Sequence, residues 1–318
     1  MAVYTPVSAE ALADFLTRFD VGELVSAKGI AEGVENSNYM VDTTRGRFFL
    51  TLYEKRVDVA DLPYFMALLD HLDAKGLPVP PAIKDRRGVK IHELEGRPAC
   101  LIKFLPGVSP SHPTPAQARA AGAELGQMHQ AVSDFALLRT NSMGVDSWAP
   151  LFDRCGPDLE RIQPGLYDEA ARMLEGVLAQ WPANEALPRS AIHADLFPDN
   201  VLMLGDKVTG LIDFYFACTD FRAFDLAVMH TSWAFDATGG HYDDAVGRTL
   251  VEGYRSEVAL TDAELAALPA LARGACLRFF LSRAWDWLNT PGDALVTRKD
   301  PLAYRRRYDH YASVGAFA

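Results

Sequence analysis

The stretch AIHADLFPDNVLMLGDKVTGLIDF, residues 191–214, places Asp195, Asn200 and Asp213 beside two apolar runs that have the pattern of buried strands. A buried charge is costly unless it is paired or binds a metal. These three side chains therefore either cap turns, as most loop aspartates do, or form a functional site.

A β-hairpin would bring two of these side chains together. NVLML and VTGLID flank GDK, a turn of the hairpin type, so Asn200 and Asp213 are expected to face each other at its open end. An amide oxygen and a carboxylate are hard ligands of the kind that Mg²⁺ takes, with nucleotide phosphates in the remaining positions. Asp195, on the loop that enters the hairpin, could then accept the proton of a hydroxyl group beside the metal.

The spacing His193-x-Asp195-x4-Asn200, followed by a hairpin and Asp213, matches the order of base, metal-binding Asn and metal-binding Asp in kinases. Such a spacing is expected by chance about once in a hundred chains of this kind. The pattern therefore favours phosphoryl transfer. A zinc hydrolase is a remote alternative, because an Asp/Asn pair with no ligand-spaced His is a poor zinc site.

The elements that must position this site change character along the chain. Before residue 104 the patterns alternate between helix and strand, with a helix after Ser8, hairpin turns near Gly33 and at TTRGR, and a helix at DLPYFMALLDHLDAKGL. Two further strands are expected in VKIHELEGRPACLIKFLPG. After the Pro-rich linker FLPGVSPSHPTPAQ, helices are predicted at about 115–132, 165–181, 222–236, 241–255 and 262–288, and the final YRRRYDHY is expected to be a solvated helix end.

These patterns predict an α+β protein of two lobes. The small β-rich N-terminal lobe would span residues 1–104, and the larger, mainly helical C-terminal lobe residues 105–318. No internal repeat or low-complexity segment is present.

Composition argues against several other classes of protein. The net charge of −11 and the pI near 5.2 disfavour a nucleic-acid surface, which needs a basic stripe. No run of about 18 uninterrupted apolar residues indicates a membrane span, and the N-terminus lacks the pattern of a signal peptide. The four cysteines are widely spaced, as in a reduced cytoplasmic protein. We therefore expect a cytoplasmic protein that acts on a small molecule and contacts neither nucleic acid nor membrane.

The motifs IHADLFPDNVL and GLIDF resemble those of the aminoglycoside phosphotransferase and choline kinase class, which has a two-lobed protein-kinase-like fold. Nearly the whole chain is similar, more narrowly, to the bacterial homoserine kinases built on that fold. The segments of this narrower resemblance are GVENSNY (33–39), FLTLYEKR (49–56), LDHLDAKGLPVP (69–80), IHADLFPDNV (192–201), GLIDFYFAC (210–218) and RFFLSRAWDWL (278–288).

The resemblance implies ATP and Mg²⁺ as cofactors and the side-chain hydroxyl of L-homoserine as the phosphoryl acceptor, a step of threonine synthesis. Choline, ethanolamine or an aminoglycoside is the alternative acceptor. A nucleotide-binding protein without turnover is the alternative from a different class.

Roles at the centre of the site follow from the resemblance. Asp195 would accept the hydroxyl proton, and Asn200 and Asp213 would hold Mg²⁺. His193 is expected to support the loop through backbone hydrogen bonds, with proton shuttling as the second interpretation. Asp225 looks like the Asp at a helix start that braces the catalytic loop in this family, and a plain N-cap is the alternative.

The N-terminal lobe departs from the wider kinase pattern, because it contains neither a Walker A sequence nor a complete GxGxxG. GIAEGVENSNY is expected to form a loop that covers the phosphates, with an ordinary turn as the alternative. Its predicted contributors are Gly33 and the possible donors Asn36, Ser37 and Asn38.

Thr51 occupies the position at which kinases place a phosphate-binding Lys, and the homoserine kinase resemblance includes this Thr. Lys55 or Arg56 could supply the positive charge instead. The hinge LIKFLPG is expected to pair with adenine through backbone groups that include those of Ile102 and Phe104, or to be a simple linker.

An amino-acid acceptor presents a carboxylate, which calls for an Arg fork, and an ammonium group, which calls for an acid. In LRFFLSRAWDWL, Arg278 and Trp285 are seven residues apart on one helix face, and Asp286 follows. Arg278 is predicted to clamp the carboxylate, with Asp286, Tyr215 and His230 as further candidates for the acceptor site. A core helix with its Arg at the rim is the alternative.

Overall fold

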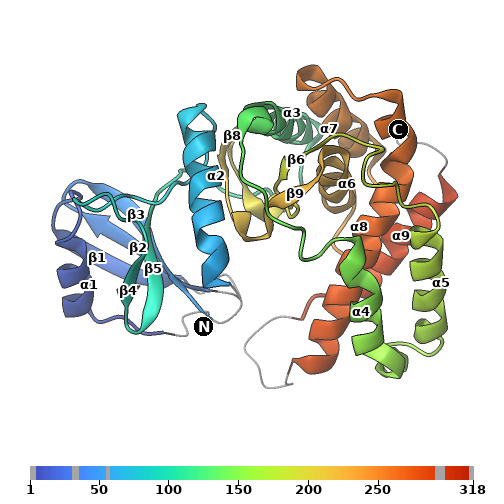
Figure 1. Cartoon of the computed structure of the whole chain (residues 1–318), viewed down its shortest axis with the longest axis horizontal. Coiled ribbons are helices and arrows are strands. Elements are labelled where there is room, and N and C mark those ends of the chain that lie inside the picture. Colours follow the sequence, from blue (N-terminus) through green and yellow to red (C-terminus); the bar gives the residue numbers. More distant parts are fainter. Residues whose placement is uncertain (1–4, 31–35, 55–57, 291–297, 315–318) are drawn as a thin grey trace. The chain divides into compact units, whose positions relative to one another are not determined.

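The computed structural model describes residues 5–30, 36–54, 58–290 and 298–314. The chain divides into two compact units, Met1–Pro106 and Gly107–Ala318. The division follows Pro106, whereas the sequence placed it after residue 104. Strands dominate the first unit and helices the second (Figure 1), which confirms the predicted α+β class.

The N-terminal unit is built on a five-stranded antiparallel sheet with the strand order β1-β2-β3-β5-β4. The strands are β1 (Leu24–Ile30), β2 (Asn36–Thr43), β3 (Gly46–Tyr53), β4 (His92–Leu94) and β5 (Arg97–Lys103). The pair Thr43–Gly46 confirms the hairpin predicted at TTRGR. The turn predicted near Gly33 lies outside the described residues.

The two faces of this sheet differ because successive side chains point to opposite sides. One face, which includes Tyr39, Val41, Leu50 and Leu101, packs on α1 (Ala9–Leu16) to form the core of this unit. Ser8 caps α1 as predicted, since its Oγ accepts a hydrogen bond from the amide of Ala11 at 3.1 Å.

The opposite face of the sheet presents the cross-strand pairs Asn38–Thr51 and Met40–Phe49. The second helix of the unit, α2 (Leu62–Ala74), begins at the predicted Pro-containing turn and is followed by Gly76 at φ +88°.

The C-terminal unit contains the helices α3 (Pro115–Ala131), α4 (Val145–Cys155), α5 (Leu166–Leu178), α6 (Arg222–Trp233), α7 (Asp244–Glu257), α8 (Asp262–Asn289) and α9 (Leu302–Ser313). Five of them match predicted helices, and α4 was not predicted. The expectation that YRRRYDHY is solvated was wrong, because Tyr304, Arg307 and Tyr311 on one face of α9 are buried.

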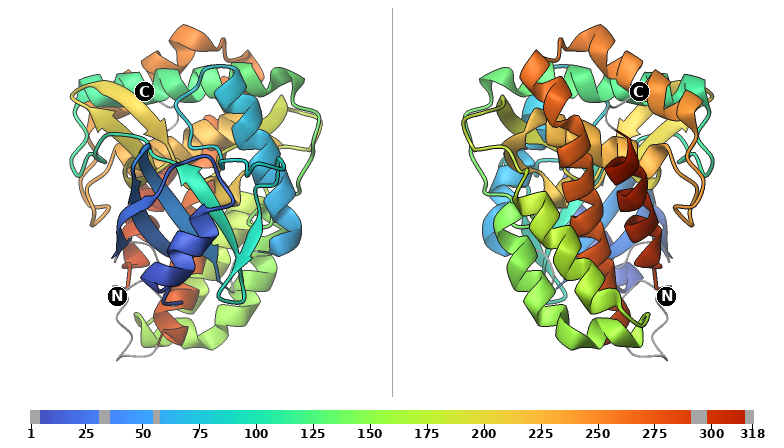
Figure 2. Two further views of the ribbon diagram at one scale, coloured as in Figure 1. Left: turned by 90° about the vertical axis from the view of Figure 1, so that its left-hand side faces the viewer. Right: turned by 90° about the vertical axis from the view of Figure 1, so that its right-hand side faces the viewer.

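Helix α8 is the centre of this unit, with α4 and α5 on one side and α9 on the other (Figure 2). Among the residues that the structure describes, α8 alone is long and apolar enough to cross a membrane. Most of its apolar side chains are buried against neighbouring helices, as in the core helix of a globular unit.

Helices α3 and α7 pack at very close range through glycines. A Cβ atom at Gly122 would lie 2.1 Å from the carbonyl oxygen of Leu250, and one at Gly253 would lie 2.0 Å from that of Arg119. The close approach therefore requires glycine at both positions.

Two short antiparallel pairs in the same unit surround the motif of interest. β7 (Val201–Leu204) and β8 (Lys207–Leu211) form the predicted hairpin. β6 (Arg189–Ile192) pairs with β9 (Cys218–Phe221), which the sequence had not indicated. The segment His193–Asn200, here called the catalytic loop, thus connects β6 to β7, and α6 starts directly after β9.

Candidate active site

The hairpin brings Asn200 and Asp213 to the same end, as predicted. Val201 pairs with Leu211, and one residue further out the amide of Ile212 donates to the carbonyl oxygen of Asn200 at 3.0 Å. Asp213 is the next residue and has left-handed backbone angles, φ +64° and ψ +57°, a conformation that aspartate tolerates better than most residues. Its carboxylate is exposed at the open end of the hairpin.

Asn200 is directly connected to the predicted base. Its Nδ2 donates to the backbone oxygen of Asp195 at 2.7 Å and to Oδ2 of the same residue at 3.3 Å. The amide of Phe197 also donates to the Asp195 carbonyl, at 2.8 Å. The catalytic loop is therefore folded tightly around Asp195, whose carboxylate remains half-buried.

The donor set suits a hard divalent cation. Because Nδ2 of Asn200 is used by Asp195, its Oδ1 is the atom left for a ligand, and it accepts no hydrogen bond from the residues that the structure describes. In that same part of the chain, no group of three or more His, Cys, Asp or Glu side chains could hold a metal. Asn200 and Asp213 thus fit a site whose remaining ligands are phosphate and water oxygens.

Asp225 braces the catalytic loop from beneath. Its side chain is fully buried in α6 and accepts hydrogen bonds from the amides of His193 at 2.7 Å and Ala194 at 2.8 Å. Ala194 has φ +64°, which is strained for a residue with a Cβ. Asp225 lies in the first turn of α6, but its oxygens accept hydrogen bonds from the catalytic loop and not from the first amides of its own helix. Its contacts therefore fit the bracing interpretation better than the N-cap interpretation.

The contacts of His193 are those expected of a residue that supports the loop. Its Nε2 lies 2.9 Å from the carbonyl oxygen of Ile212, and its Nδ1 accepts from the amide of Asp195 at 3.3 Å. Both ring nitrogens are therefore occupied, in the neutral tautomer with hydrogen on Nε2. Burial lowers the pKa of the ring, although Asp225 opposes this, which also favours the neutral form. The imidazole thus ties the amide of Asp195 to Ile212, the residue directly after β8.

Arg278 is not placed as the carboxylate clamp that the sequence predicted. Its guanidinium is buried, with Nη1 donating to the carbonyl oxygen of Ala194 and the group stacked 4.4 Å from the ring centre of Phe279. It holds the catalytic loop instead of opening toward solvent as a fork. Nor does it form one subsite with Trp285, which stacks on Arg154 of α4 at 4.1 Å.

The electrostatic setting of Asp195 combines burial with opposing charges. Burial raises the pKa of its carboxyl to about 8, Arg278 and Lys299 lower it, and Asp213 and Asp199 raise it. A cation bound at Asn200 and Asp213 would lower this pKa, because an adjacent positive charge favours the carboxylate.

The other predicted acceptor residues are scattered. Tyr215 lies half-buried in the single 3₁₀ turn Phe214–Phe216, directly after Asp213. Asp286 is exposed near the end of α8. His230 is a buried core residue whose Nδ1 lies 2.6 Å from the hydroxyl of Tyr311.

The residues predicted to cover the phosphates stand in a strand. Asn36, Ser37 and Asn38 begin β2, so their placement in a turn was wrong. Ser37 is buried and donates to Oε1 of Glu54 at 2.7 Å, whereas Asn38 is half-buried and its Oδ1 accepts from Thr51 Oγ1 at 2.8 Å. Of the three, Asn38 retains the best-placed donor. Gly33, Lys55 and Arg56 lie outside the described residues.

The backbone at the predicted adenine site is partly committed to the sheet. Ile102 pairs with Phe49 of β3 and also bridges to Ala82, so its placement in an open hinge was wrong. Phe104 lies just beyond the end of β5, half-buried, and stacks on Phe49 with ring centres 5.5 Å apart. Its backbone makes no hydrogen bond to the described residues, so of the two it is the better candidate for contacting a base.

Sequence reasoning missed further residues that position the catalytic loop. His129 of α3 lies with Nε2 3.2 Å from Asp225 and Nδ1 2.8 Å from the hydroxyl of Tyr254. Trp233 of α6 donates from Nε1 to the carbonyl oxygen of Leu196 at 3.0 Å. No local pattern marks either residue, because each lies more than thirty residues from the loop.

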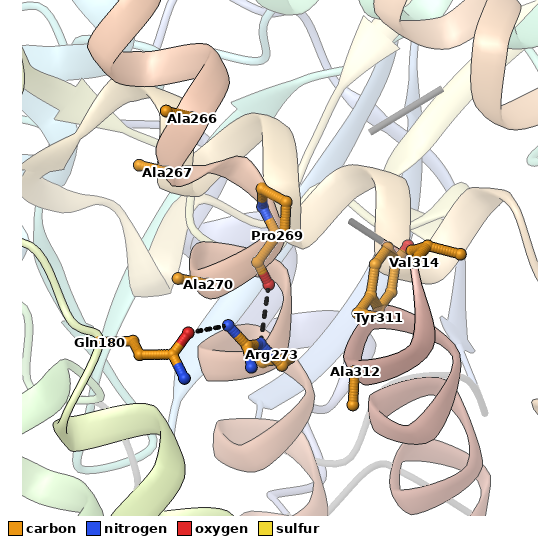
Figure 3. Close-up of a pocket in the computed structure, with 9 residues that line it drawn as sticks. All are labelled: Gln180, Ala266, Ala267, Pro269, Ala270, Arg273, Tyr311, Ala312 and Val314. Atoms are coloured by element: carbon orange, nitrogen blue, oxygen red, sulfur yellow. Dashed lines mark hydrogen bonds between the residues drawn. The ribbon is translucent and has the colours of Figure 1, made fainter. Parts of the chain in front are cut away.

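A cavity of about 380 Å³ lies in another part of the C-terminal unit, between the start of α8 and the end of α9 (Figure 3). Arg273 crosses it and donates to Gln180 Oε1 at 2.6 Å. None of its lining residues belongs to the catalytic loop or to the predicted site, so we assign it no part in the chemistry.

Comparison with known proteins connects this geometry to a family. Residues 26–272 match the model of the phosphotransferase enzyme family. The homoserine kinase of Nitrobacter winogradskyi is 51% identical over 315 residues, which cover 99% of this chain and 96% of that protein. The homoserine kinase of Acidiphilium cryptum is 50% identical over 318 residues, covering 100% and 99%.

Solved structures show the same fold at low sequence identity. An amicoumacin kinase in complex with AMP-PNP, Ca²⁺ and Ami aligns with a TM-score of 0.72 at 15% identity, over 97% of this chain and 94% of that one. The microcompartment-associated aminopropanol kinase aligns with a TM-score of 0.66 at 18% identity, over 98% and 99%. The chain therefore belongs to the phosphotransferase enzyme family, and within it to the homoserine kinases.

Proposed function

We propose that the protein is an ATP-dependent homoserine kinase that forms O-phospho-L-homoserine. The observation that supports this most strongly is the fixed group of Asp195, Asn200 and Asp213 in a chain about 50% identical over its whole length to homoserine kinases. The N-terminal unit serves as the nucleotide-binding lobe and the C-terminal unit as the catalytic lobe. A cytoplasmic location fits a biosynthetic role of this kind.

The proposed reaction is an in-line transfer. The hydroxyl oxygen of homoserine bonds to the γ-phosphorus of ATP while the bond from that phosphorus to the β,γ-bridging oxygen breaks, and ADP leaves. The hydroxyl proton passes to a carboxylate oxygen of Asp195. Asp195 is positioned as a base, so no covalent phospho-enzyme is required.

The residues around Asp195 prepare this step before substrate arrives. Asp225 and Arg278 hold the loop backbone on two sides, and His193 links it to the end of β8. Asn200 and Asp213 would hold Mg²⁺, which when bound compensates the charge of the phosphates. Preorganisation of this kind lowers the barrier, because little rearrangement remains when the reaction occurs.

Two other interpretations have less support. A cationic acceptor such as choline or an aminoglycoside is favoured only by the fold, which solved kinases share at 15% and 18% identity, whereas homoserine kinases are about 50% identical over the whole chain. A protein without turnover would not need these three side chains held together. Asn200 bonds to Asp195, and Ile212, which precedes Asp213, bonds to Asn200. The Thr at position 51 is the one feature that favours such a protein.

The test is ADP release with L-homoserine, L-serine, choline, ethanolamine and an aminoglycoside as acceptors. L-Homoserine should give the highest kcat/KM, and a higher value for a cationic acceptor would contradict the proposal. Asp195→Asn should lower kcat by about 10²–10⁴-fold. Asp206→Asn is the matched control, because this carboxylate is exposed in the turn of the same hairpin, at the end opposite Asn200 and Asp213; its activity should stay close to that of the wild type.

A further inference from the structure

A row of aromatic contacts connects the catalytic loop to two helices that come late in the sequence. Phe197, two residues after Asp195, lies with its ring centre 4.8 Å from that of Phe279 on α8. Phe279 in turn lies 5.0 Å from Tyr304 on α9. The guanidinium of Arg283, one turn after Phe279, sits 4.5 Å over the ring of Tyr304. Arg283 and Tyr304 are thereby fixed relative to the base.

Arg283 differs from its neighbours Arg278 and Lys299 because it is neither fully buried nor paired with an acid of the described residues. Arg278 is buried against the Ala194 carbonyl, and Lys299 pairs with Asp199. Arg283 is half-buried, and its hydrogen bond to the described residues is a long one, 3.4 Å from Nη1 to the carbonyl oxygen of Asp300. No carboxylate of those residues pairs with it, although the charge of Asp195 reaches it and opposes the lowering of its pKa by burial.

Tyr304 presents a donor without a partner. Its side chain is fully buried, yet its hydroxyl makes no hydrogen bond to the residues that the structure describes. A second guanidinium, that of Arg307, lies 4.4 Å over the same ring. Burial raises the pKa of Tyr304, so the phenol stays protonated and can donate. A buried hydroxyl left unpaired is costly, and a bound ligand is one way to satisfy it.

We propose that Arg283 and Tyr304 bind the carboxylate of the acceptor amino acid while Asp195 faces its hydroxyl. A carboxylate is the group that complements a guanidinium together with a neutral O–H donor, since both would donate to its two oxygens. This inference rests on the proposed function and names the residues that select an acceptor with a carboxylate. It replaces the assignment of that role to Arg278, whose guanidinium holds the loop.

The same pair would discriminate against acceptors that lack the carboxylate. 3-Amino-1-propanol is homoserine without its carboxyl group, and it would leave Arg283 uncompensated beside the base. Arg283→Gln should raise the KM for L-homoserine about 10- to 100-fold, with the KM for ATP unchanged. It should also reduce the preference for L-homoserine over 3-amino-1-propanol. Arg273→Gln, on the same helix but bonded to Gln180 and the carbonyl oxygen of Pro269, is the matched control and should change neither KM.

Tyr304→Phe separates binding from folding. Because the hydroxyl makes no bond to the described protein, its removal should leave the urea midpoint of unfolding unchanged or higher while the KM for L-homoserine rises. A lower midpoint with an unchanged KM would overturn the inference, as would equal changes in both KM values for Arg283→Gln. If the wild type itself prefers a cationic acceptor, the proposed function fails. If it prefers L-homoserine and Arg283→Gln retains that preference, only this inference fails.

Discussion

Replacing Asp225 by Asn tests the idea that one buried carboxylate holds the catalytic loop. The carboxylate accepts from the amides of His193 and Ala194 with its two separate oxygens, at 2.7 and 2.8 Å, and from His129 at 3.2 Å. Asn has the same shape but only one acceptor atom. Its NH₂ group would therefore face a backbone N–H, and one of the two amides would lose its partner.

The expected loss can be worked out from these contacts. A buried N–H without a partner costs about 1–3 kcal/mol. The hydrogen bond that survives is weaker by roughly 1 kcal/mol, because a neutral acceptor stabilises it less than a charged one. We therefore expect Asp225→Asn to lower the free energy of unfolding by about 2–4 kcal/mol. Ala194, at φ +64°, would relax once released, so kcat/KM should fall on the order of 10²-fold.

Urea unfolding followed by tryptophan fluorescence measures this loss, because all five tryptophans belong to the C-terminal unit. Asp243→Asn is the matched control. Asp243 accepts from Val246 N at 3.0 Å as the N-cap of α7, a position at which Asn is as good as Asp. An equal midpoint for Asp225→Asn and wild type, with normal kcat/KM, would refute the reasoning.

The pH dependence gives a further check on the same variant. Burial raises the pKa of Asp225, but His129 and the loop amides outweigh it, so the pKa lies below its usual value. A lowered pKa means stability that is present above the unfolded-state pKa of about 3.9 and is lost as the pH falls through the folded-state value. The stability gap between wild type and Asp225→Asn should therefore narrow below about pH 4.

Two further predictions concern packing and nucleotide binding. Gly122→Ala should lower the urea midpoint and reduce the free energy of unfolding by about 1–3 kcal/mol or more, because the added Cβ would lie 2.1 Å from the Leu250 carbonyl oxygen. Gly176→Ala in α5, where the nearest atom to the added Cβ is the Tyr308 hydroxyl oxygen at 3.5 Å, should instead raise the free energy of unfolding by up to about 1 kcal/mol. Urea midpoints that shift in the same direction in both variants would contradict this account. Thr51→Val removes the hydroxyl that holds the Asn38 amide and should raise the KM for ATP about 2- to 10-fold, whereas Thr51→Ser should not. An unchanged KM in both variants would exclude Asn38 from phosphate binding.

The sequence by itself identified the residues of the proposed reactive centre. Asp195, Asn200 and Asp213 lie within twenty residues of each other, and a hairpin with a Gly-containing turn allows few arrangements of its ends. The β-rich segment that forms β3 was likewise predicted to be a strand, with Thr51 at the position of the kinase Lys. Local geometry was sufficient in these cases, because the contacts that matter are close in the chain.

Tertiary structure alone decided which side chains contact the catalytic loop and which are candidates for the acceptor site. Asp225, Arg278 and Trp233 reach the catalytic loop from 31 to 84 residues away, and Tyr304 contacts the loop residue Phe197 with ring centres 6.3 Å apart. Arg278 is the clearest example. Its position in the helix suggested a guanidinium open to a substrate carboxylate, but the fold buries it against the Ala194 carbonyl oxygen. A buried charge or donor must find a partner, and which partner it finds depends on packing between segments that the local pattern does not specify.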